Sequence, residues 1–339
     1  MHRIDTAPLR RLPQNVRLRW QRRVLHFRVP AMTSRGALKE RVTYIIEATC
    51  NHGVGYGECC VMPGLLAEIE PPTLDYWCNQ AELNHTAILP SAPAPVRFGI
   101  ETAVLSALRG GAPRWDTPFT RGESGIPIHC LIWMADADTM LHRIHEGIQR
   151  GFTCLKMKVG ALPFNQEIDM LREVKRVFPS AEIRVDANGA FHPAEALSKL
   201  TALAELGVSS IEQPIGTKQW VHMAELCKHS PLPIALDEEL IHAEDMALLL
   251  DSISPAAIVI KPSLHGGLLA AEQWAAAATE RGIDWWVNSA LESNVGLTAL
   301  AEWCAYAAPN RIQGLGTGSL FVDDEPGKVS LQGTQLCFN

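Results

Sequence analysis

The chain has 339 residues, of which 47% are hydrophobic and 20% are charged, and its formal net charge is -7 at pH 7. This composition indicates a globular protein with a large buried core, and the acidic balance argues against a nucleic-acid-binding surface. No apolar run reaches the ~18 residues of a transmembrane helix, and no signal peptide is recognisable. The nine cysteines include no Cys-x-x-Cys pair, which indicates reduced thiols. We therefore expect a cytoplasmic protein that binds neither nucleic acid nor a membrane.

Residues 1–123 are expected to form an α+β domain. Residues 17–30 alternate polar and apolar side chains, which is typical of strands with one solvated face. A binding arm is the alternative for this arginine-rich stretch. Residues 42–60 indicate antiparallel strands around a glycine-rich turn, and residues 94–110 predict an amphipathic helix.

From about residue 124 the sequence repeats short buried strands, each followed by a helical pattern such as residues 165–178 or 267–282. The expected strands are residues 126–133, 153–159, 182–186, 208–213, 233–239, 256–261, 283–288 and 311–316. Such units, about 25 residues apart, predict an α/β fold with a (β/α)7β-type TIM-like barrel, and a doubly wound parallel sheet is the alternative. We expect the barrel to span residues 124–319, and residues 320–339 to complete the N-terminal capping domain.

Charged side chains stand at the ends of five consecutive predicted strands, where a barrel places its active site. They are Lys156 and Lys158, Asp186, Glu212, Asp237 and Lys261. A single charge at a strand end is usually a helix N-cap or a solvated residue, but that reading does not account for five in a row.

Three neighbouring carboxylates raise one another's pKa unless a cation neutralises them. Oxygen ligands without cysteine or histidine suit Mg²⁺, with substrate oxygens and water completing the octahedron. Lysines that flank such a metal are placed to move a proton at a carbon atom whose developing negative charge the metal stabilises. The pattern therefore predicts a magnesium-dependent enzyme of proton transfer at carbon.

The Lys-x-Lys pair, the three acidic strand ends and the later lysine resemble the enolase superfamily, in its muconate-lactonizing-enzyme branch. Within that branch the chain is most similar to the o-succinylbenzoate synthase family. Residues 258–267 (IVIKPSLHGG), 289–303 (SALESNVGLTALAEW) and 313–321 (QGLGTGSLF) resemble late barrel segments of that family, and residues 28–41 resemble its mobile N-terminal loop. The resemblance extends from about residue 18 to residue 320.

The resemblance implies Mg²⁺-dependent dehydration of 2-succinyl-6-hydroxy-2,4-cyclohexadiene-1-carboxylate to 2-succinylbenzoate, in menaquinone biosynthesis. Lys158 would remove the proton next to the substrate carboxylate and then assist departure of the hydroxyl as water. Lys261 would lie on the opposite face and stabilise the enediolate, and Lys156 would be an auxiliary cation. The ligands of Mg²⁺, for which Mn²⁺ could substitute, would be Asp186, Glu212 and Asp237.

Other residues near the strand ends are candidates for supporting roles. Asn188 and Glu238 would orient a ligand or pair with a lysine, although a plain surface role fits each of them as well. The glycines after the eighth strand could offer N–H groups to a carboxylate or simply form a tight turn. Arg35 could steer a carboxylate, or could be an exposed loop residue without that role. The candidate substrate contacts are Ser34, Arg35, Ser289, Leu291, Glu292, Gly314 and Gly316.

Two stretches depart from the family pattern. Residues 237–239 read Asp-Glu-Glu where the family often has Asp-Glu-Ser, which affects contacts around the ligands and not the ligand set. Residues 28–36 read RVPAMTSRG in place of an RPAG-like sequence, which leaves the substrate contacts of this loop open.

The same residues are compatible with racemisation of N-acylamino acids or epimerisation of dipeptides. Lys158 and Lys261 would then act as acid and base on opposite faces of one α-carbon, through the same enediolate. No Asp-x-Asp signature of dipeptide binding follows the eighth strand, where residues 316–321 read GTGSLF, and this favours dehydration. A barrel that binds a small anion without turnover is a third hypothesis, against which the complete set of charged residues argues. The substrate would be a small carboxylate, and the enzyme a monomer or a homo-oligomer.

Overall fold

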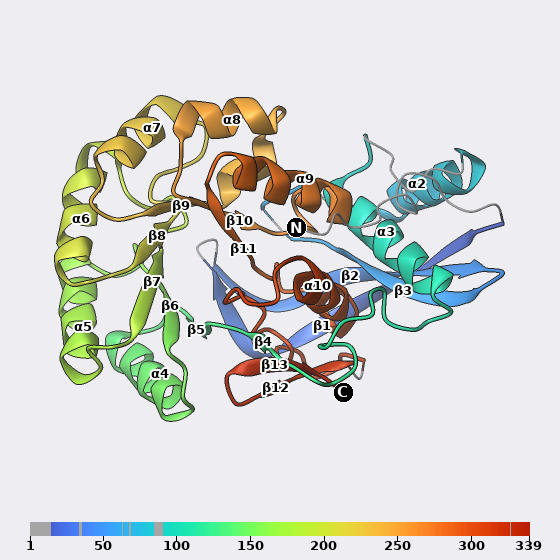
Figure 1. The fold of residues 1–339 in the computed structure, drawn as a ribbon, viewed down its shortest axis with the longest axis horizontal. Coiled ribbons are helices and arrows are strands. Elements are labelled where there is room, and N and C mark those ends of the chain that lie inside the picture. The colour runs from blue at the N-terminus through green and yellow to red at the C-terminus, as the bar shows by residue number, and fades with distance from the viewer. Residues whose placement is uncertain (1–14, 34–35, 63, 68, 85–90, 326) are drawn as a thin grey trace.

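The computed structural model describes residues 15–33, 36–62, 64–67, 69–84, 91–325 and 327–339. An antiparallel sheet with two helices forms the N-terminal part, and a curled parallel sheet surrounded by helices follows it (Figure 1). The predicted α/β fold, with a TIM-like barrel behind an N-terminal α+β part, is confirmed. No helix in these ranges is long and apolar enough to cross a membrane, and all nine cysteines are free thiols.

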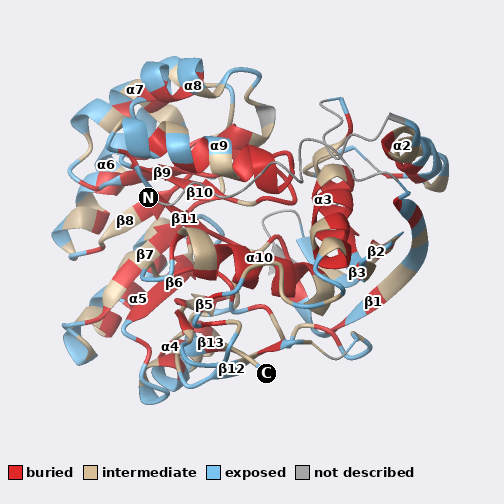
Figure 2. Cartoon of the chain, turned by 45° about the vertical axis from the view of Figure 1, so that its right-hand side comes forward, coloured by how far each residue is buried: buried red, intermediate tan, exposed pale blue. Residues whose placement is uncertain are grey.

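The N-terminal sheet has the order β1-β2-β3. Its elements are β1 (Arg17–Thr33), β2 (Gly36–Cys50) and β3 (Gly53–Cys60), with the helices α2 (Pro71–Asn84) and α3 (Ala94–Leu108). Tyr44 and Ile46 of β2 are buried and alternate with more exposed residues, as a period-two pattern predicts, and Leu18 of β1 packs with them on the same face. Farther along β1, Leu25 is buried on the opposite face of the sheet. Helix α3 is buried over most of its length, between the sheet and the barrel (Figure 2).

The barrel part contains seven parallel strands in the order of the chain. The strands are β5 (Cys130–Ile132), β6 (Cys154–Lys158), β7 (Glu182–Asp186), β8 (Ser210–Glu212), β9 (Ile234–Leu236), β10 (Ala257–Ile260) and β11 (Asp284–Val287). The helices are α4 (Ala137–Gln149), α5 (Phe164–Val177), α6 (Pro193–Glu205), α7 (Trp220–His229), α8 (Met246–Ile253), α9 (Gly267–Glu280) and α10 (Asn294–Ala307), with a 3₁₀ helix, η1 (Glu238–His242). Strands such as β10 are buried along their whole length because helices cover one face of the sheet and the barrel interior fills the other.

The first expected strand, residues 126–133, is divided in the structure. Its start is β4 (Ile126–Pro127), which pairs with the C-terminal hairpin, and only its end is the barrel strand β5. That hairpin consists of β12 (Val329–Gln332) and β13 (Gln335–Phe338).

The eighth expected strand, residues 311–316, is present only as two isolated parallel bridges. Gln313 bridges to Ile128 and Gly314 bridges to Asn288, which closes the barrel between β11 and β5. The side chain of Gln313 supplies part of the missing ladder, since its Oε1 accepts a hydrogen bond from the backbone N–H of Val287 at 2.7 Å.

The chain after the barrel returns to the N-terminal sheet. The backbone N–H of Arg28 donates to the carbonyl of Leu320 at 2.8 Å, and the rings of Phe27 and Phe321 lie 4.6 Å apart. The proposed division into residues 1–123 and 124–319, with residues 320–339 added to the first part, stays a prediction.

A buried carboxylate joins α3 to the barrel. Glu101 accepts hydrogen bonds from the backbone N–H groups of Leu268 at 2.6 Å and Leu269 at 3.4 Å, in the first turn of α9. The carboxyl oxygen thereby satisfies N–H groups that have no partner within the helix. The preceding Gly267 has a φ of +87°, and a Cβ there would lie 2.3 Å from the Glu101 carboxylate, so only glycine fits.

We predict that Glu101→Gln makes thermal stability less dependent on pH. Burial raises the pKa of Glu101 from 4.5 to about 8 in the folded chain. The folded state therefore holds a proton that the unfolded state releases, so this contribution to stability is complete below pH 4.5 and is lost as the pH rises through about 8. Between these values the Tm of the wild type should fall relative to that of the variant.

The measurement is calorimetry from pH 5 to pH 8.5. Glu280→Gln, on the exposed side of α9, is the matched control and should keep the wild-type pH dependence. Parallel Tm profiles for Glu101→Gln and the wild type would contradict the assignment.

Candidate active site

The predicted acidic strand ends meet at one point inside the barrel. Asp186 and Glu212 are paired in register at the ends of β7 and β8, and Asp237 follows β9 directly. All three side chains are buried, and each offers an oxygen atom within 4.8 Å of the others. The parallel register produces this meeting, because it brings the carboxyl ends of adjacent strands to the same edge.

The three predicted lysines lie against these carboxylates. Lys156 Nζ is 2.6 Å from Glu212 Oε2 and 2.9 Å from Asp186 Oδ2. Lys158 Nζ is 2.6 Å from Asp186 Oδ2, and Lys261 pairs with Asp237 from the far side of the cluster. Because β6 and β10 flank β7, β8 and β9 in the sheet order, Lys158 and Lys261 stand on opposite sides of the acidic group.

The charges in this cluster fit an additional cation. Burial raises the pKa of Asp186, but the Lys156 and Lys158 ammonium groups outweigh burial and hold it well below its usual range. Burial and the charge of Asp186 together raise the pKa of Glu212 well above its usual range. In addition, Glu212 Oε1 and Asp237 Oδ1 are buried without a hydrogen-bond partner among the described residues. Oxygen donors of this kind are those that a divalent metal ion binds.

The two candidates for supporting roles belong to the same network. Asn188 Oδ1 accepts a hydrogen bond from Lys158 Nζ at 2.7 Å. Asn188 Nδ2 donates to Glu238 Oε1 at 2.8 Å, and its backbone N–H donates to Asp186 Oδ1 at 3.0 Å. This side chain therefore orients Lys158, and Glu238 orients Asn188.

A pocket of about 110 Å³ opens above the cluster and is lined by all three lysines, Asn188 and Glu238. Of the predicted substrate contacts, Ser289, Leu291 and Gly314 line it. Glu292 and Gly316 are not among its lining residues, and Ser34 and Arg35 lie outside the described residues. Glu292 is buried and accepts hydrogen bonds from Ser289 Oγ at 2.6 Å and from the N–H of Ala290 at 2.8 Å, so it shapes the loop that carries the lining residues.

Two further lining residues, His129 and Asn288, were missed in the sequence. With its amide oriented so that both ends are satisfied, Asn288 accepts a hydrogen bond from Lys156 Nζ at 2.9 Å. A Cβ on Gly314 would lie 1.9 Å from this amide, so glycine is required there. Asn288 directly follows β11, in a position like that of the charged residues at the other strand ends. It is uncharged, so the pattern of charged strand ends does not include it.

The signal for His129 was the period-two pattern of residues 126–133, in which His129, Leu131 and Trp133 face the same side. All three line the pocket. Burial and the charge of Lys156 lower the pKa of His129 well below its usual value, so its ring is neutral at pH 7.

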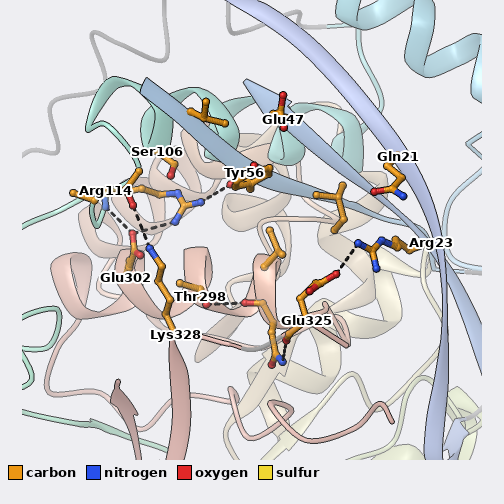
Figure 3. A pocket seen from close by; sticks show the side chains of 16 residues that line it. Gln21, Arg23, Glu47, Tyr56, Ser106, Arg114, Thr298, Glu302, Glu325 and Lys328 are labelled. Carbon is orange, nitrogen blue, oxygen red and sulfur yellow. Dashed lines mark hydrogen bonds and ion pairs between the residues drawn. The ribbon is translucent and has the colours of Figure 1, made fainter. Parts of the chain in front are cut away.

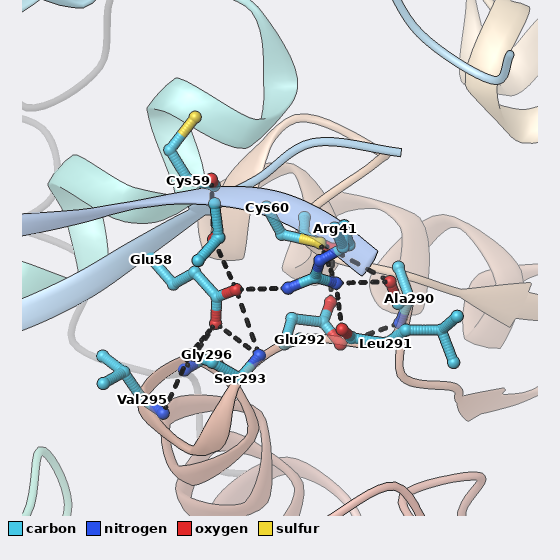
Figure 4. A network of polar contacts seen from close by, with 12 residues as sticks. Arg41, Glu58, Cys59, Cys60, Ala290, Leu291, Glu292, Ser293, Val295 and Gly296 are labelled. Atoms are coloured by element: carbon cyan, nitrogen blue, oxygen red, sulfur yellow. Dashed lines mark hydrogen bonds and ion pairs between the residues drawn. The ribbon is translucent and has the colours of Figure 1, made fainter. Parts of the chain in front are cut away.

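A buried ion pair of the N-terminal sheet holds the loop after β11 (Figure 4). Arg41 lies 2.6 Å from Glu58 and donates to the carbonyl of Leu291. Glu58 Oε2 accepts hydrogen bonds from the N–H groups of Ser293 at 2.8 Å and Gly296 at 3.1 Å, at the start of α10. The pair therefore fixes both the helix start and the wall residue Leu291.

A larger cavity, of about 590 Å³, lies between the N-terminal sheet and α10 (Figure 3). Its charged side chains include two ion pairs, Arg23 with Glu325 at 2.6 Å and Arg114 with Glu302 at 3.1 Å. None of the predicted catalytic residues lines it. We therefore assign the chemistry to the smaller pocket over the carboxylates.

Comparisons of the sequence and of the structure with known proteins identify the same superfamily. The family model for enolase C-terminal domain-like proteins matches residues 139–330. The o-succinylbenzoate synthase of Desulfotalea psychrophila is 41% identical to this chain, in an alignment that covers 94% of this chain and 98% of that protein. The crystal structure of MenC from Desulfotalea psychrophila LSv54 superposes with a TM-score of 0.81 and 36% identity, over 95% of this chain and 99% of that chain.

Epimerases share the fold at lower identity. The L-Ala-D/L-Glu epimerase of Bacillus subtilis, in a substrate-liganded complex, superposes with a TM-score of 0.83 over 96% of this chain and 97% of that chain. Its sequence identity in that superposition is 20%, which shows a common fold alone.

Proposed function

We propose that this chain, which belongs to the o-succinylbenzoate synthases of the enolase superfamily, dehydrates 2-succinyl-6-hydroxy-2,4-cyclohexadiene-1-carboxylate to 2-succinylbenzoate, a step of menaquinone biosynthesis. The family model and the synthase from Desulfotalea psychrophila confirm the family resemblance found in the sequence. The observation that carries the proposed reaction is the buried group of three carboxylates with a lysine on each side.

Asp186, Glu212 and Asp237 would hold a divalent metal ion, which we propose to be Mg²⁺, with Mn²⁺ as a possible substitute. Bound there, the metal supplies a positive charge that stabilises the negative charge developing on the substrate carboxylate when its neighbouring carbon loses a proton. The buried oxygen atoms of Glu212 and Asp237 that lack a partner support this assignment.

Lys158 is the proposed base. Its Nζ is fixed by Asp186 at 2.6 Å and by Asn188 at 2.7 Å, so it is held in one place at the rim of the pocket. It takes the proton from the carbon that bears the substrate carboxylate, and the same proton then accompanies the departing hydroxyl as water. The ring becomes aromatic, which makes the elimination favourable.

Lys261 is the proposed counter-charge. It contacts Asp237 across the acidic group from Lys158, which supports a position on the other face of a bound ring. There an ammonium group stabilises the enediolate through charge and through contact with the ring face. Lys156 lies deeper, between Glu212 and Asp186, and we propose that it balances their charge as an auxiliary cation.

Epimerisation is the second candidate function. A 30% identical relative, the L-Ala-D/L-Glu epimerase of Bacillus subtilis, matches over 161 residues, or 47% of this chain. The two lysines on opposite sides of the acidic group suit that reaction as well, because each could exchange a proton with one face of an α-carbon.

The experiment that separates the two reactions offers the cyclohexadiene acid and an N-succinylamino acid to the purified enzyme. We expect kcat/KM to be higher for dehydration, because the pocket walls contributed by Leu131, Trp133 and Leu291 suit an apolar ring. Aromatisation is followed by ultraviolet absorbance and racemisation by optical rotation. Faster racemisation than dehydration would assign the chain to the second reaction.

We predict that Lys158→Ala abolishes exchange of the substrate α-proton with solvent and lowers kcat by at least about 10²- to 10⁴-fold, since the base is lost. Proton exchange in D₂O is followed by NMR, and turnover by absorbance. Lys228→Ala, on the exposed side of α7, removes an equal charge and should leave both rates unchanged. Near-normal exchange in the Lys158 variant would disprove its role as the base.

We predict that Mg²⁺ at 100 times its Kd increases the free energy of unfolding of the wild type by about 2.7 kcal/mol and therefore raises its Tm. Asp237→Asn should reduce this response strongly, whereas Asp169→Asn, on the exposed side of α5, should keep it. Turnover should stop on chelation and return with Mg²⁺. Full turnover in the presence of a chelator would remove the metal from the mechanism.

A further inference from the structure

The side chain of His129 has no assigned role, although it lines the active-site pocket. It is only 4% exposed, and its Nδ1 has no hydrogen-bond partner among the described residues. A buried polar group without a protein partner is unfavourable, and in a pocket a ligand can supply the missing hydrogen bond.

The position of His129 is fixed by the closing seam of the barrel. Its backbone N–H donates to the carbonyl of Gln313 at 3.1 Å, immediately before β5 begins. A Cβ on Gly314 would lie 2.9 Å from its Cε1, so the absence of a side chain at Gly314 leaves room for the ring. His129 therefore stands on the side of the barrel formed by β5 and β11, while the three carboxylates stand on β7, β8 and β9.

The other polar side chains on this side of the pocket already have partners. Asn288 accepts from Lys156, Ser289 donates to Glu292, and Thr317 donates to Ser289 at 2.9 Å. The apolar residues Leu131, Trp133 and Leu291 form the rest of this wall. His129 thus has the one polar side chain of this wall that is free to bind a substrate oxygen, within the described part of the chain.

The largest charge effects on His129 come from three cations and one anion. Lys156, Arg184 and Lys158 act on it as neighbouring cations, and Asp186 is the opposing anion. An imidazole carries at least one N–H in either charge state, so it can donate to an oxygen without a change of protonation. Hydrogen bonds between such a donor and a charged acceptor are stronger than those between neutral groups.

We propose that His129 binds the terminal carboxylate of the succinyl substituent, at the end of the substrate remote from the reacting carbon. This inference rests on the proposed function, in which the ring carboxylate faces the acidic side of the pocket and the substituent extends towards β5 and β11. His129 is then a substrate-binding residue that selects for a second carboxylate and takes no part in the proton transfer.

The test compares two ligands in binding experiments that require no turnover. One is the product 2-succinylbenzoate, and the other is 2-butanoylbenzoate, which keeps the keto group and lacks the terminal carboxylate. His129→Phe keeps a ring and removes the donor. We expect it to weaken binding of 2-succinylbenzoate about 10- to 100-fold and to leave binding of 2-butanoylbenzoate within about 3-fold. Binding is measured by calorimetry with Mg²⁺ present.

Two rescue variants and one control complete the design. His129→Asn and His129→Gln place an N–H near the positions of Nδ1 and Nε2, and at least one should recover most of the affinity for 2-succinylbenzoate. His145→Phe, on the exposed side of α4, should bind both ligands as the wild type does. With the cyclohexadiene substrate, His129→Phe should raise KM by a similar factor and change kcat less than about 3-fold, since the contact is the same in ground and transition states.

Each other outcome overturns the inference. Equal losses for the two ligands, a loss in kcat alone, or unchanged binding of 2-succinylbenzoate would show that His129 does not bind this carboxylate. Failure of the proposed function is seen separately, as a wild-type enzyme that does not dehydrate the cyclohexadiene acid.

Discussion

Three carboxylates held within 4.8 Å of one another inside a protein repel each other, and the active site is arranged around that repulsion. Lysines from the two flanking strands neutralise part of the charge. Burial and, after it, the charge of Asp186 raise the pKa of Glu212 well above its usual range. Buried oxygen donors in this arrangement suit a divalent cation, and a lysine stands on each side of them.

The N-terminal part of the chain stabilises the opposite wall through two more buried carboxylates. Glu101 binds the first turn of α9, and Glu58 binds the first turn of α10. These helices follow the strands that end at Lys261 and Asn288. Because each carboxylate satisfies helix N–H groups that would otherwise be buried without partners, the loops between strand and helix are held in one conformation.

The two sides of the pocket differ in the side chains that they carry. The side formed by β7, β8 and β9 carries the three buried carboxylates. The side formed by β5 and β11 carries His129, Asn288 and several apolar residues, which line the same pocket. Under the proposed function, proton transfer and substrate choice would therefore depend on different strands.

The sequence by itself indicated the barrel, the acidic cluster and the lysines, because short buried strands in parallel register bring their carboxyl ends to one edge. It also indicated the candidates Asn188 and Glu238, which lie near ligands along the chain. Only the tertiary structure decided the closing seam, where Gln313 and Gly314 form bridges in place of an eighth strand. It also decided contacts such as that of Glu58 with Ser293, 235 residues apart in the sequence. Local pattern fixes which way a side chain faces, whereas its partner across such a distance depends on how the whole chain packs.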